Sequence, residues 1–544
     1  MVRPLPTGLP AFPRLDPAKI PGSVGGRRIL RERGALEESL SIGHDYLVRM
    51  PRLTRCFVLL VDGLRADVAE AQLRAGALPH LAAMLRDGGH TRAITVFPST
   101  TSVAYLPFLT GCTPGTCNVP SIRWLDRTKY AGRWWRDREA VRSYCGYQAS
   151  RLDHDIAGDV RTIFELVPDS IGLFTPIARG LTPARDPSRR ERQLWGTVAH
   201  FAQWHQPSDN AVTRHLLRAV EGNARFVFAQ FPAVDGYTHQ THPDAEPVHR
   251  ALRRVDTTVG MLRARLRARG ELASTLILVV SDHGSATVHT HLDLADWFRR
   301  HGVPTLSHPV LWERSPRAAV MVAGNGSAMV YARPDEPRPH RWPIERLRHP
   351  DSFGSATDLV AALLREPAVG LVAAETEEGG VWVSDRGGDA RILRTARGIR
   401  YQPMTGDPLA CGGPRSGSER DWLEATWDDG YPDAAYQLLD HFTAGRAGDL
   451  LVVAREGYDF RKRFEVPEHR AGHGSLVRSH MQTPVWSSER LPAEPMRTVD
   501  LFPSILDWLA ISAPERIDGE LVWRPGSQTR RTHLEPVPGA LTPS

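Results

Sequence analysis

Three short hydrophobic runs of this sequence each end in acidic or imidazole side chains, and a further histidine stands between two glycines. In chain order these residues are Asp62, Asp235, His239, Asp282, His283 and His473. Carboxylate oxygen and imidazole nitrogen are ligands that zinc and manganese accept. A single residue of this kind after a strand is ordinarily part of a turn, or a histidine with a hydrogen-bond partner. Six of them in one chain predict a metal centre instead.

The spacing within these groups is compatible with shared ligation. Asp235 and His239 lie four residues apart, so a helical turn or a tight loop can direct both at one ion. Asp282 and His283 are adjacent, and adjacent residues point to opposite faces of a strand. Because the chain turns where a strand ends, both side chains can still reach one metal there.

Three hydroxyl residues, Thr100, Thr101 and Ser102, follow a proline turn and precede a segment with helical spacing. We expect them to start that helix, where a hydroxyl ordinarily caps free amide groups. One of them could instead be a nucleophile. A divalent cation lowers the pKa of a bound hydroxyl, and a helix N-terminus favours an incoming anion. The pattern alone leaves open which of the three this is.

The hydrophobic runs that carry these residues are typical of buried parallel strands. The run 57–61 stops at Asp62, and the runs 225–231 and 275–280 repeat that pattern. Segments with helical spacing, 66–87 and 248–269, alternate with them. This alternation predicts an α/β fold with a doubly wound, mostly parallel sheet and helices on both faces. Its ligand site is expected outside the carboxyl ends of the strands.

The chain divides into segments of different pattern. Residues 1–52 are rich in proline, glycine and arginine, and they predict an irregular arm with one short helix near 34–41. Residues 53–284 and 466–544 are expected to build the catalytic core. The intervening segment 285–465 has short β-like runs and polar loops, which predict an inserted α+β cap with additional strands.

Length and composition indicate a large globular protein. The 544 residues are 41% hydrophobic and 24% charged, which is enough to bury a core without disulfides. Only three of the 68 basic residues are lysine, and no long basic run favours nucleic-acid binding. The first residues lack an apolar signal-like segment, and no apolar run is long enough to span a membrane. We therefore expect a cytoplasmic protein without a membrane partner, and the sequence leaves its oligomeric state open.

Five motifs resemble, in their order along the chain, those of the type I phosphodiesterase/nucleotide pyrophosphatase family of the alkaline phosphatase superfamily. They are VDGLR (61–65), FPSTTSVAYLPFLTG (97–111), AVDGYTH (233–239), VSDHG (280–284) and GHG (472–474). The resemblance implies an alkaline phosphatase-like fold. It also implies hydrolysis of phosphoric diesters and pyrophosphates, with a small-molecule phosphate ester or pyrophosphate as substrate.

The resemblance further implies a role for each residue. The family's threonine nucleophile lies ten residues before the glycine of a Thr-Gly pair, and Gly111 then identifies Thr101. Two divalent metal ions are implied, zinc or, in the cytoplasm, manganese. One ion would be held by Asp62, Thr101, Asp282 and His283, and the other by Asp235, His239 and His473. Thr101 would form a covalent intermediate that water then releases.

One departure from the family's pattern concerns the substrate. The family commonly has an asparagine about twenty residues beyond the nucleophile, where it holds a phosphate oxygen, and this chain has Ile122 at that offset. Asn118 and Arg123 are the expected replacements, and an arginine would suit a more highly charged phosphate.

Other histidines and other activities remain as alternatives. His242 is a rival of His473 as a metal ligand, whereas His289 and His291 are expected to be supporting or structural. A phosphomonoesterase or a phosphonate hydrolase would use the same seven residues. A sulfatase is excluded, because CTPGT (112–116) lacks the arginine of the C-x-P-x-R motif. A non-catalytic binding protein on the same fold is disfavoured by the complete ligand set, and diesters are the favoured substrates.

Overall fold

The structure is a computed structural model that describes residues 54–130, 138–309, 313–461 and 467–525. The predicted arm at 1–52, with its helix near 34–41, lies outside the described residues, as does the chain after residue 525. The division of the chain into core and cap segments stays a prediction. Within the described ranges, no helix is long and apolar enough to cross a lipid bilayer.

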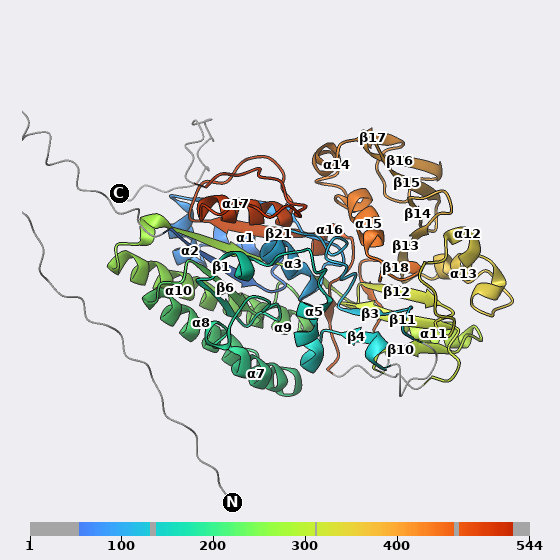
Figure 1. Cartoon of the computed structure of the whole chain (residues 1–544), viewed down its shortest axis with the longest axis horizontal. Coiled ribbons are helices and arrows are strands. Elements are labelled where there is room, and N and C mark those ends of the chain that lie inside the picture. Colours follow the sequence, from blue (N-terminus) through green and yellow to red (C-terminus); the bar gives the residue numbers. More distant parts are fainter. Residues whose placement is uncertain (1–53, 131–137, 310–312, 462–466, 526–544) are drawn as a thin grey trace, which may run out of the picture. The chain divides into compact units, whose positions relative to one another are not determined.

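The main sheet has six strands in the order β2-β21-β7-β1-β6-β5 (Figure 1). The strands β7, β1, β6 and β5 run parallel, whereas β21 lies between β7 and the edge strand β2 and pairs antiparallel with both. Their bounds are β1 Arg55–Val61, β2 Gly89–Ile94, β5 Ser170–Leu173, β6 Phe226–Phe231, β7 Thr275–Val280 and β21 Gln482–Ser487. The predicted mostly parallel, doubly wound α/β sheet is confirmed.

Helices cover both faces of this sheet because β1 is apolar on both sides. All seven of its residues are buried, and alternate residues point to opposite faces. The side chains at 56, 58 and 60 share one core with α3 (Leu106–Thr110) and α17 (Leu501–Trp508). Those at 57, 59 and 61 share another with α8 (Gln206–Glu221) and α10 (Glu246–Ala268).

One sequence-based expectation for the first crossover is wrong. The segment 66–87 is not one helix but two, α1 (Ala66–Arg74) and α2 (Pro79–Leu85). Gly76 with φ of 71° follows the end of α1, and Pro79 starts α2 because its missing amide costs nothing at a first helical position. The following strand β2 pairs antiparallel with β21.

The second sheet has nine strands in the order β10-β11-β12-β18-β13-β14-β15-β16-β17, coloured yellow to orange in Figure 1. All neighbouring pairs except β10 and β11 are antiparallel. Their bounds are β10 Thr305–Ser307, β11 Ala318–Ala323, β12 Ser327–Ala332, β13 Val369–Glu375, β14 Val381–Ser384, β15 Asp389–Thr395, β16 Gly398–Thr405, β17 Arg415–Gly417 and β18 Leu450–Ala454.

Short strand pairs connect distant parts of the chain. The pair β8 and β20 is antiparallel and the pair β9 and β19 is parallel, so the segment after β7 lies beside the segment before residue 473. The bounds of these short strands are β3 Arg123–Leu125, β4 Val141–Ser143, β8 Ala286–Thr287, β9 Thr290–His291, β19 Tyr458–Asp459 and β20 Ala471–Gly472. Further helices used below are α5 Leu152–Asp155, α7 Arg189–Ala202, α9 Ala233–Gln240, α11 Leu294–Arg300 and α16 Arg478–Met481.

Candidate active site

Asp62 follows the central strand β1 and is held at the carboxyl edge of the main sheet. Its Oδ2 accepts hydrogen bonds from the Tyr105 hydroxyl and the Gln230 amide, both at 2.8 Å. Gly63 has φ of 69°, and a Cβ at this position would lie 2.6 Å from Oδ1 of Asp235. A glycine is therefore required where the two acidic residues approach each other.

Thr101 lies beside Asp62 and His283. Its Oγ1 donates to Oδ1 of Asp62 at 3.2 Å and lies 3.2 Å from Nε2 of His283. The Thr100 hydroxyl is buried without a hydrogen-bond partner in the described part of the chain. Of the three adjacent hydroxyls, the one at residue 101 is therefore directed at both a carboxylate and an imidazole.

The expectation that these three residues start a helix is wrong by a few positions. The short 3-10 helix begins at Val103, and Ser102 precedes it with φ of 72° and no side-chain capping bond. A left-handed residue cannot continue a right-handed helix. The hydroxyls therefore lie in the turn before the helix rather than in its first turn.

Asp282 and His283 follow β7, next to β1 in the sheet, and both are fully buried. Nε2 of His283 lies 3.2 Å from Oδ2 of Asp282 and 3.4 Å from Oδ1 of Asp62. Because the chain leaves the strand at Val280, these neighbours share one side of the site despite their adjacency. Oδ2 of Asp282 has no hydrogen-bond partner in the described residues, as expected of a ligand atom.

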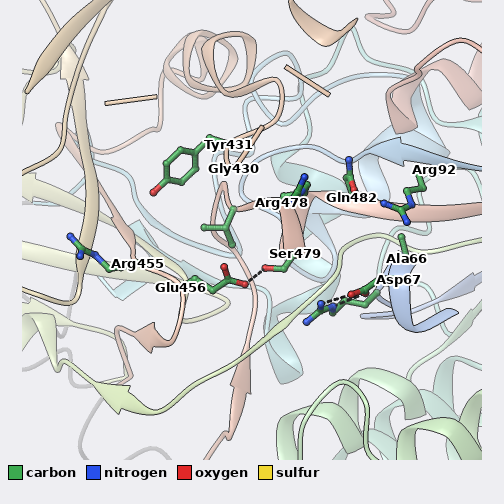
Figure 2. Close-up of a pocket in the computed structure, with 12 residues that line it drawn as sticks. Ala66, Asp67, Arg92, Gly430, Tyr431, Arg455, Glu456, Arg478, Ser479 and Gln482 are labelled. Atoms are coloured by element: carbon green, nitrogen blue, oxygen red, sulfur yellow. Dashed lines mark hydrogen bonds and ion pairs between the residues drawn. The ribbon is translucent and has the colours of Figure 1, made fainter. Parts of the chain in front are cut away.

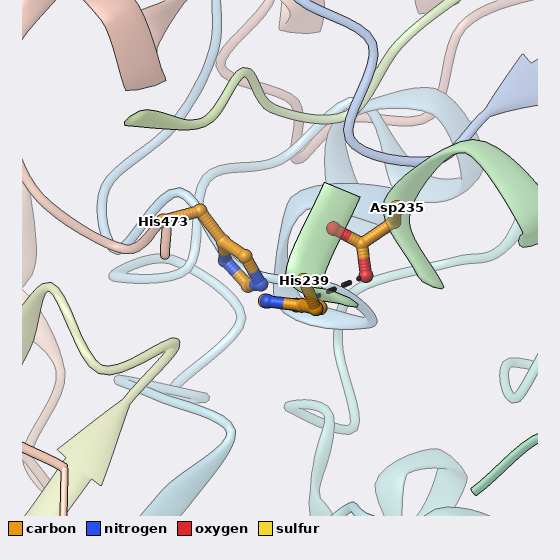
Figure 3. A group of neighbouring side chains, drawn as sticks. All are labelled: Asp235, His239 and His473. Carbon is orange, nitrogen blue, oxygen red and sulfur yellow. Dashed lines mark ion pairs between the residues drawn. The ribbon is translucent and has the colours of Figure 1, made fainter. Parts of the chain in front are cut away.

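Asp235 and His239 are one turn apart on α9, which follows β6 (Figure 3). Oδ2 of Asp235 lies 3.2 Å from Nε2 of His239. Figure 3 shows the His473 ring arriving from a separate loop and pointing toward this pair. It stacks on His283 with ring centroids 3.8 Å apart and lies 5.2 Å from the ring of His239.

The second sheet holds the loop that supplies His473. The turn between β11 and β12 pairs with this loop, since the His473 amide donates to the Gly324 carbonyl at 3.1 Å. The Gly326 amide donates to the His473 carbonyl at 2.7 Å. Gly324 has φ of 52°, and a Cβ there would lie 2.5 Å from Nδ1 of the histidine. The segment predicted to be a cap thus helps to build the site.

All three imidazoles are oriented in the way that metal-ligating histidines usually are. Each Nδ1 lies within hydrogen-bond distance of a backbone carbonyl: His239 with Ala471 at 2.7 Å, His473 with Ser99 at 3.0 Å and His283 with Gly284 at 3.0 Å. A proton on Nδ1 leaves the Nε2 lone pair free for an ion, and carbonyl partners of this kind fix ring orientation. The donor set therefore fits a metal.

Two overlapping groups of ligand atoms lie within 4.8 Å of one another: Asp235, His239 and His473, and Asp62, Asp235 and His283. Oxygen and imidazole nitrogen donors in such groups suit zinc or manganese. All seven residues predicted from the sequence as metal ligands or nucleophile are thus brought together at one edge of the main sheet. The cluster could hold more than one divalent ion.

The charges in the cluster shift one another strongly. Burial lowers the pKa of His283, but Asp282 and Asp62 outweigh it and raise the pKa to about 10. Burial also lowers the pKa of His239, but the neighbouring Asp235 outweighs this effect and raises the pKa to about 9. Burial and the neighbouring Asp62 raise the pKa of Asp282 well above its usual value. Protons and divalent cations would therefore compete for the same atoms.

The two predicted phosphate contacts do not touch the cluster directly. Oδ1 of Asn118 accepts from the Arg446 amide at 3.3 Å. Arg123 donates to the Val322 carbonyl at 3.2 Å and to the Cys145 sulfur at 3.5 Å. Among the described residues, neither side chain forms a hydrogen bond to Thr101 or to the candidate ligands.

The other histidines considered from the sequence have different surroundings. His242 is exposed and belongs to neither ligand group, so the structure favours His473 over this rival. Nδ1 of His291 lies 2.7 Å from Oδ1 of Asp459, where β9 pairs with β19. His289 donates its backbone amide to the Gly457 carbonyl. Both fit a structural role.

Sequence reasoning missed four residues that support the site. Tyr105 and Gln230 both bind Asp62. His469 stacks on His239 with ring centroids 4.2 Å apart, and Asp209 accepts from the Ala233 amide that starts α9 at 3.1 Å. Two signals were available: an amide alone in the apolar strand FVFAQF, and a tyrosine four residues after Thr101.

A parallel α/β sheet with carboxylates, imidazoles and one threonine at its carboxyl edge defines a metal-dependent hydrolase of the alkaline phosphatase type. The family model "type I phosphodiesterase / nucleotide pyrophosphatase" matches residues 56–476, and the chain belongs to that family of phosphoester hydrolases. The family is metal-dependent. A search of curated protein sequences finds no match.

Solved structures share the fold at low sequence identity. Murine ectonucleotide pyrophosphatase/phosphodiesterase 5 superposes with a TM-score of 0.50 and 13% identity, covering 86% of this chain and 98% of that one. Phosphonoacetate hydrolase from Sinorhizobium meliloti 1021, in complex with phosphonoacetate, gives 0.51 and 13%, covering 84% of this chain and 96% of that one. At these low sequence identities, the matches show a shared fold and nothing about function.

Proposed function

We propose that this protein is a phosphodiesterase/nucleotide pyrophosphatase that uses Thr101 as its nucleophile and two divalent metal ions, zinc by preference. The observation that carries the proposal is the position of the Thr101 hydroxyl, 3.2 Å from both Asp62 and His283 within a cluster of seven ligand-type residues. The family match supports hydrolysis of phosphoric esters.

Asp62, Thr101, Asp282 and His283 would hold one ion, and Asp235, His239 and His473 the other. Divalent ions in such a pair lower the pKa of a bound hydroxyl and stabilise charge on the attacking and leaving oxygens of an in-line displacement. Three carboxylates against two divalent ions leave the site with a net positive charge, which favours a phosphate anion.

In the proposed reaction, each side chain has a separate role. Thr101 gives up its proton to solvent water, its Oγ1 forms a bond to phosphorus, and the bond from phosphorus to the leaving oxygen breaks, so that this oxygen leaves with the electron pair and takes up a proton from water. Asp62, held by Tyr105 and Gln230, keeps the threonine directed at the reaction centre. Water then attacks the phosphorus of this threonine ester, the bond from phosphorus to Oγ1 breaks, and Oγ1 regains a proton. The first displacement thus releases the leaving alcohol or phosphate, and the second releases the other half of the substrate as a phosphomonoester.

A second candidate, a phosphomonoesterase or phosphonate hydrolase, is favoured by Ile122. This residue stands at the offset of the asparagine that diesterases of the family commonly use. It is buried, with 8% of its surface exposed, and it has no amide to offer. Arg123, next in the chain, remains the proposed phosphate contact. A guanidinium there would also suit the second negative charge of a monoester.

Turnover of aryl esters by the zinc-loaded protein tests both candidates. We expect the diester bis(p-nitrophenyl) phosphate to be cleaved faster than p-nitrophenyl phosphate or an alkyl phosphonate. A hundredfold preference for the monoester would replace the first candidate by the second. Failure to cleave any of the three, with zinc or manganese bound, would contradict a hydrolytic role.

Variants of the three adjacent hydroxyls test the nucleophile. Thr101→Ala should reduce kcat by roughly 10³-fold or more, because the covalent route is lost, while Thr101→Ser should keep part of the activity. The matched controls Thr100→Ala and Ser102→Ala should remain active. Acid quenching followed by peptide mass mapping should place the phosphoryl label on residue 101, and a label on either neighbour would refute the assignment.

A further inference from the structure

Two cavities of similar size lie outside the ligand cluster, and they differ in how many of their arginines already have partners. The first, of about 640 Å³, is shown in Figure 2. Three of its four arginines have partners: Arg65 donates two hydrogen bonds to Asp67, Arg92 donates two to Glu70, and Arg478 donates one to the Asp428 carbonyl. Only Arg455 among them has no side-chain hydrogen bond or ion pair to the described residues, so few guanidinium donors remain there for a ligand.

The second cavity, of about 550 Å³, has an excess of basic side chains. It is lined by Arg142, Arg151, His154, Arg189 and Arg192, against three acidic residues. Its volume lies within the range of small-molecule sites. The segment after β5 and the first turn of α7 form its walls together with α5 and the segment before it.

The acidic residues of this cavity are already engaged. Asp155 accepts from Nε of Arg142 at 2.9 Å and from the Tyr144 hydroxyl at 3.0 Å. Asp186 is buried and forms an ion pair with Arg192 at 3.7 Å. The third, Asp153, accepts from the Ala178 amide at 2.9 Å. These carboxylates therefore orient the walls rather than attract a cation.

Two of the arginines keep most of their donors for a ligand. The Arg151 guanidinium pairs only with Glu139 at 3.5 Å, a carboxylate that is 75% exposed, and exposed pairs of this kind are weak. The Arg189 guanidinium is exposed and makes no hydrogen bond or ion pair to the described residues. Guanidinium groups bind phosphate and carboxylate through paired hydrogen bonds.

The cavity lies along the same edge of the main sheet as the ligand cluster. The residues that line it after β5 stand at the carboxyl end of that strand, and β5 is the second neighbour of β1 through β6. At about 4.8 Å per strand, the ends of β1 and β5 are about 10 Å apart. Burial lowers the pKa of Arg192, and the neighbouring Asp186, Asp153 and the Tyr105 hydroxyl oppose that shift. Tyr105 is the residue that binds Asp62.

We propose that this cavity binds a second anionic group, a phosphate or a carboxylate, on the organic part of the phosphoric ester. Arg151 and Arg189 would be the specificity-determining residues. The assignment rests on the proposed function and narrows its substrate class to esters whose organic part carries a second negative charge. The contribution is one of binding, so it acts on KM more than on kcat.

Two probes that differ in one charge test the assignment on the metal-loaded protein. Both are p-nitrophenyl phosphodiesters whose second arm is a six-carbon chain. The chain ends in a carboxylate in one probe and in the neutral carboxamide in the other. We expect kcat/KM to be at least tenfold higher for the carboxylate, with the difference in KM. High salt should reduce this preference for the carboxylate probe, because ions screen exposed charges.

The variants change Arg151 and Arg189, and the control changes the neighbour of Arg189 on α7. Arg189→Ala combined with Arg151→Ala should remove the preference, and Arg189→Glu should reverse it. Arg190→Ala is the matched control, since Arg190 is exposed, follows Arg189 on α7 and does not line the cavity. Equal turnover of the two probes by the wild type, or a preference that survives the double substitution, would overturn the cavity assignment alone. Turnover of neither probe would instead overturn the proposed function on which it rests.

Discussion

The two halves of the ligand cluster are built in different ways. Asp62, Asp282 and His283 follow adjacent central strands directly and are almost completely buried. Asp235 and His239 belong to a short helix, they are partly exposed, and their third partner, His473, arrives on a distant loop. A half built on strand ends is fixed by the sheet, whereas a half built on a helix and a loop depends on further packing. We therefore expect the two halves to differ in how firmly they keep a metal.

The largest effect on metal content and turnover is expected when one imidazole is removed from each half in turn. His283→Ala and His473→Ala should each lose about one of the two proposed ions and reduce turnover by orders of magnitude, because buried ligand charges are left without a cation. In the wild type, a chelator should remove the ion of the Asp235 half first, since that half is more exposed.

Metal analysis during timed chelation measures this difference. His242→Ala, which removes an exposed histidine outside the cluster, is the control and should keep both ions. Release of both ions at one rate would show that the halves do not differ. Full metal content in His473→Ala would remove the loop from the site.

Asp209→Asn tests how the start of α9, which carries the Asp235 half, depends on a buried carboxyl group. Burial raises the pKa of Asp209 to about 7, whereas the unfolded chain releases this proton near pH 4. The wild type thus loses stability as pH rises from about 4 to 7, and the loss is complete above pH 7. Asparagine stays neutral and can still accept from the Ala233 amide, so the variant should gain up to about 4 kcal/mol at pH 8 and little near pH 4.

Urea unfolding at the two pH values, at equal metal loading, measures the gain. The control Asp351→Asn changes a carboxylate that is 78% exposed and should show no such pH dependence. Asp209→Ala, which leaves the helix amide unpaired, should weaken metal binding by the Asp235 half. A gain that is the same at both pH values would contradict the buried, protonated state.

The smallest effect is expected for His469, which stacks on the proposed ligand His239 but belongs to neither ligand group. Loss of such a ring contact costs about 0.5 to 1.5 kcal/mol, so His469→Ala should weaken metal binding by the Asp235 half about two- to tenfold. His469→Phe should restore most of it. The control is His301→Ala, which removes a ring whose centroid lies 4.0 Å from that of Trp297 in another part of the chain, and it should leave metal binding unchanged. A loss of more than a hundredfold would instead make His469 a ligand.

The strand-end half of the site could be predicted because its signal is local. An apolar run followed by an acidic residue fixes both the strand and the place where the side chain emerges, and β7 has the predicted bounds 275–280. The family pattern added the choice of Thr101 among three hydroxyls. The fold class followed from alternating strands and helices, as the family match and the sheet order confirm.

The other half and its supports could not be predicted in the same way. The choice between His473 and His242 depends on the turn after β11, which pairs with the loop of residue 473 across about 150 residues of sequence. Asp209 and Gln230 act through contacts between separate elements. The break between α1 and α2 was readable, since Gly76 and Pro79 stand inside the helical pattern.

The pairing of the turn after β11 with the loop of residue 473 also sets the order in which the centre can form during synthesis. Asp62 and Thr101 leave the ribosome more than 370 residues before the last imidazole, which needs the second sheet to hold it. A nascent chain therefore carries an incomplete set of the proposed ligands until residue 473 has been made. The proposed metal centre can be completed only once the second sheet has begun to form.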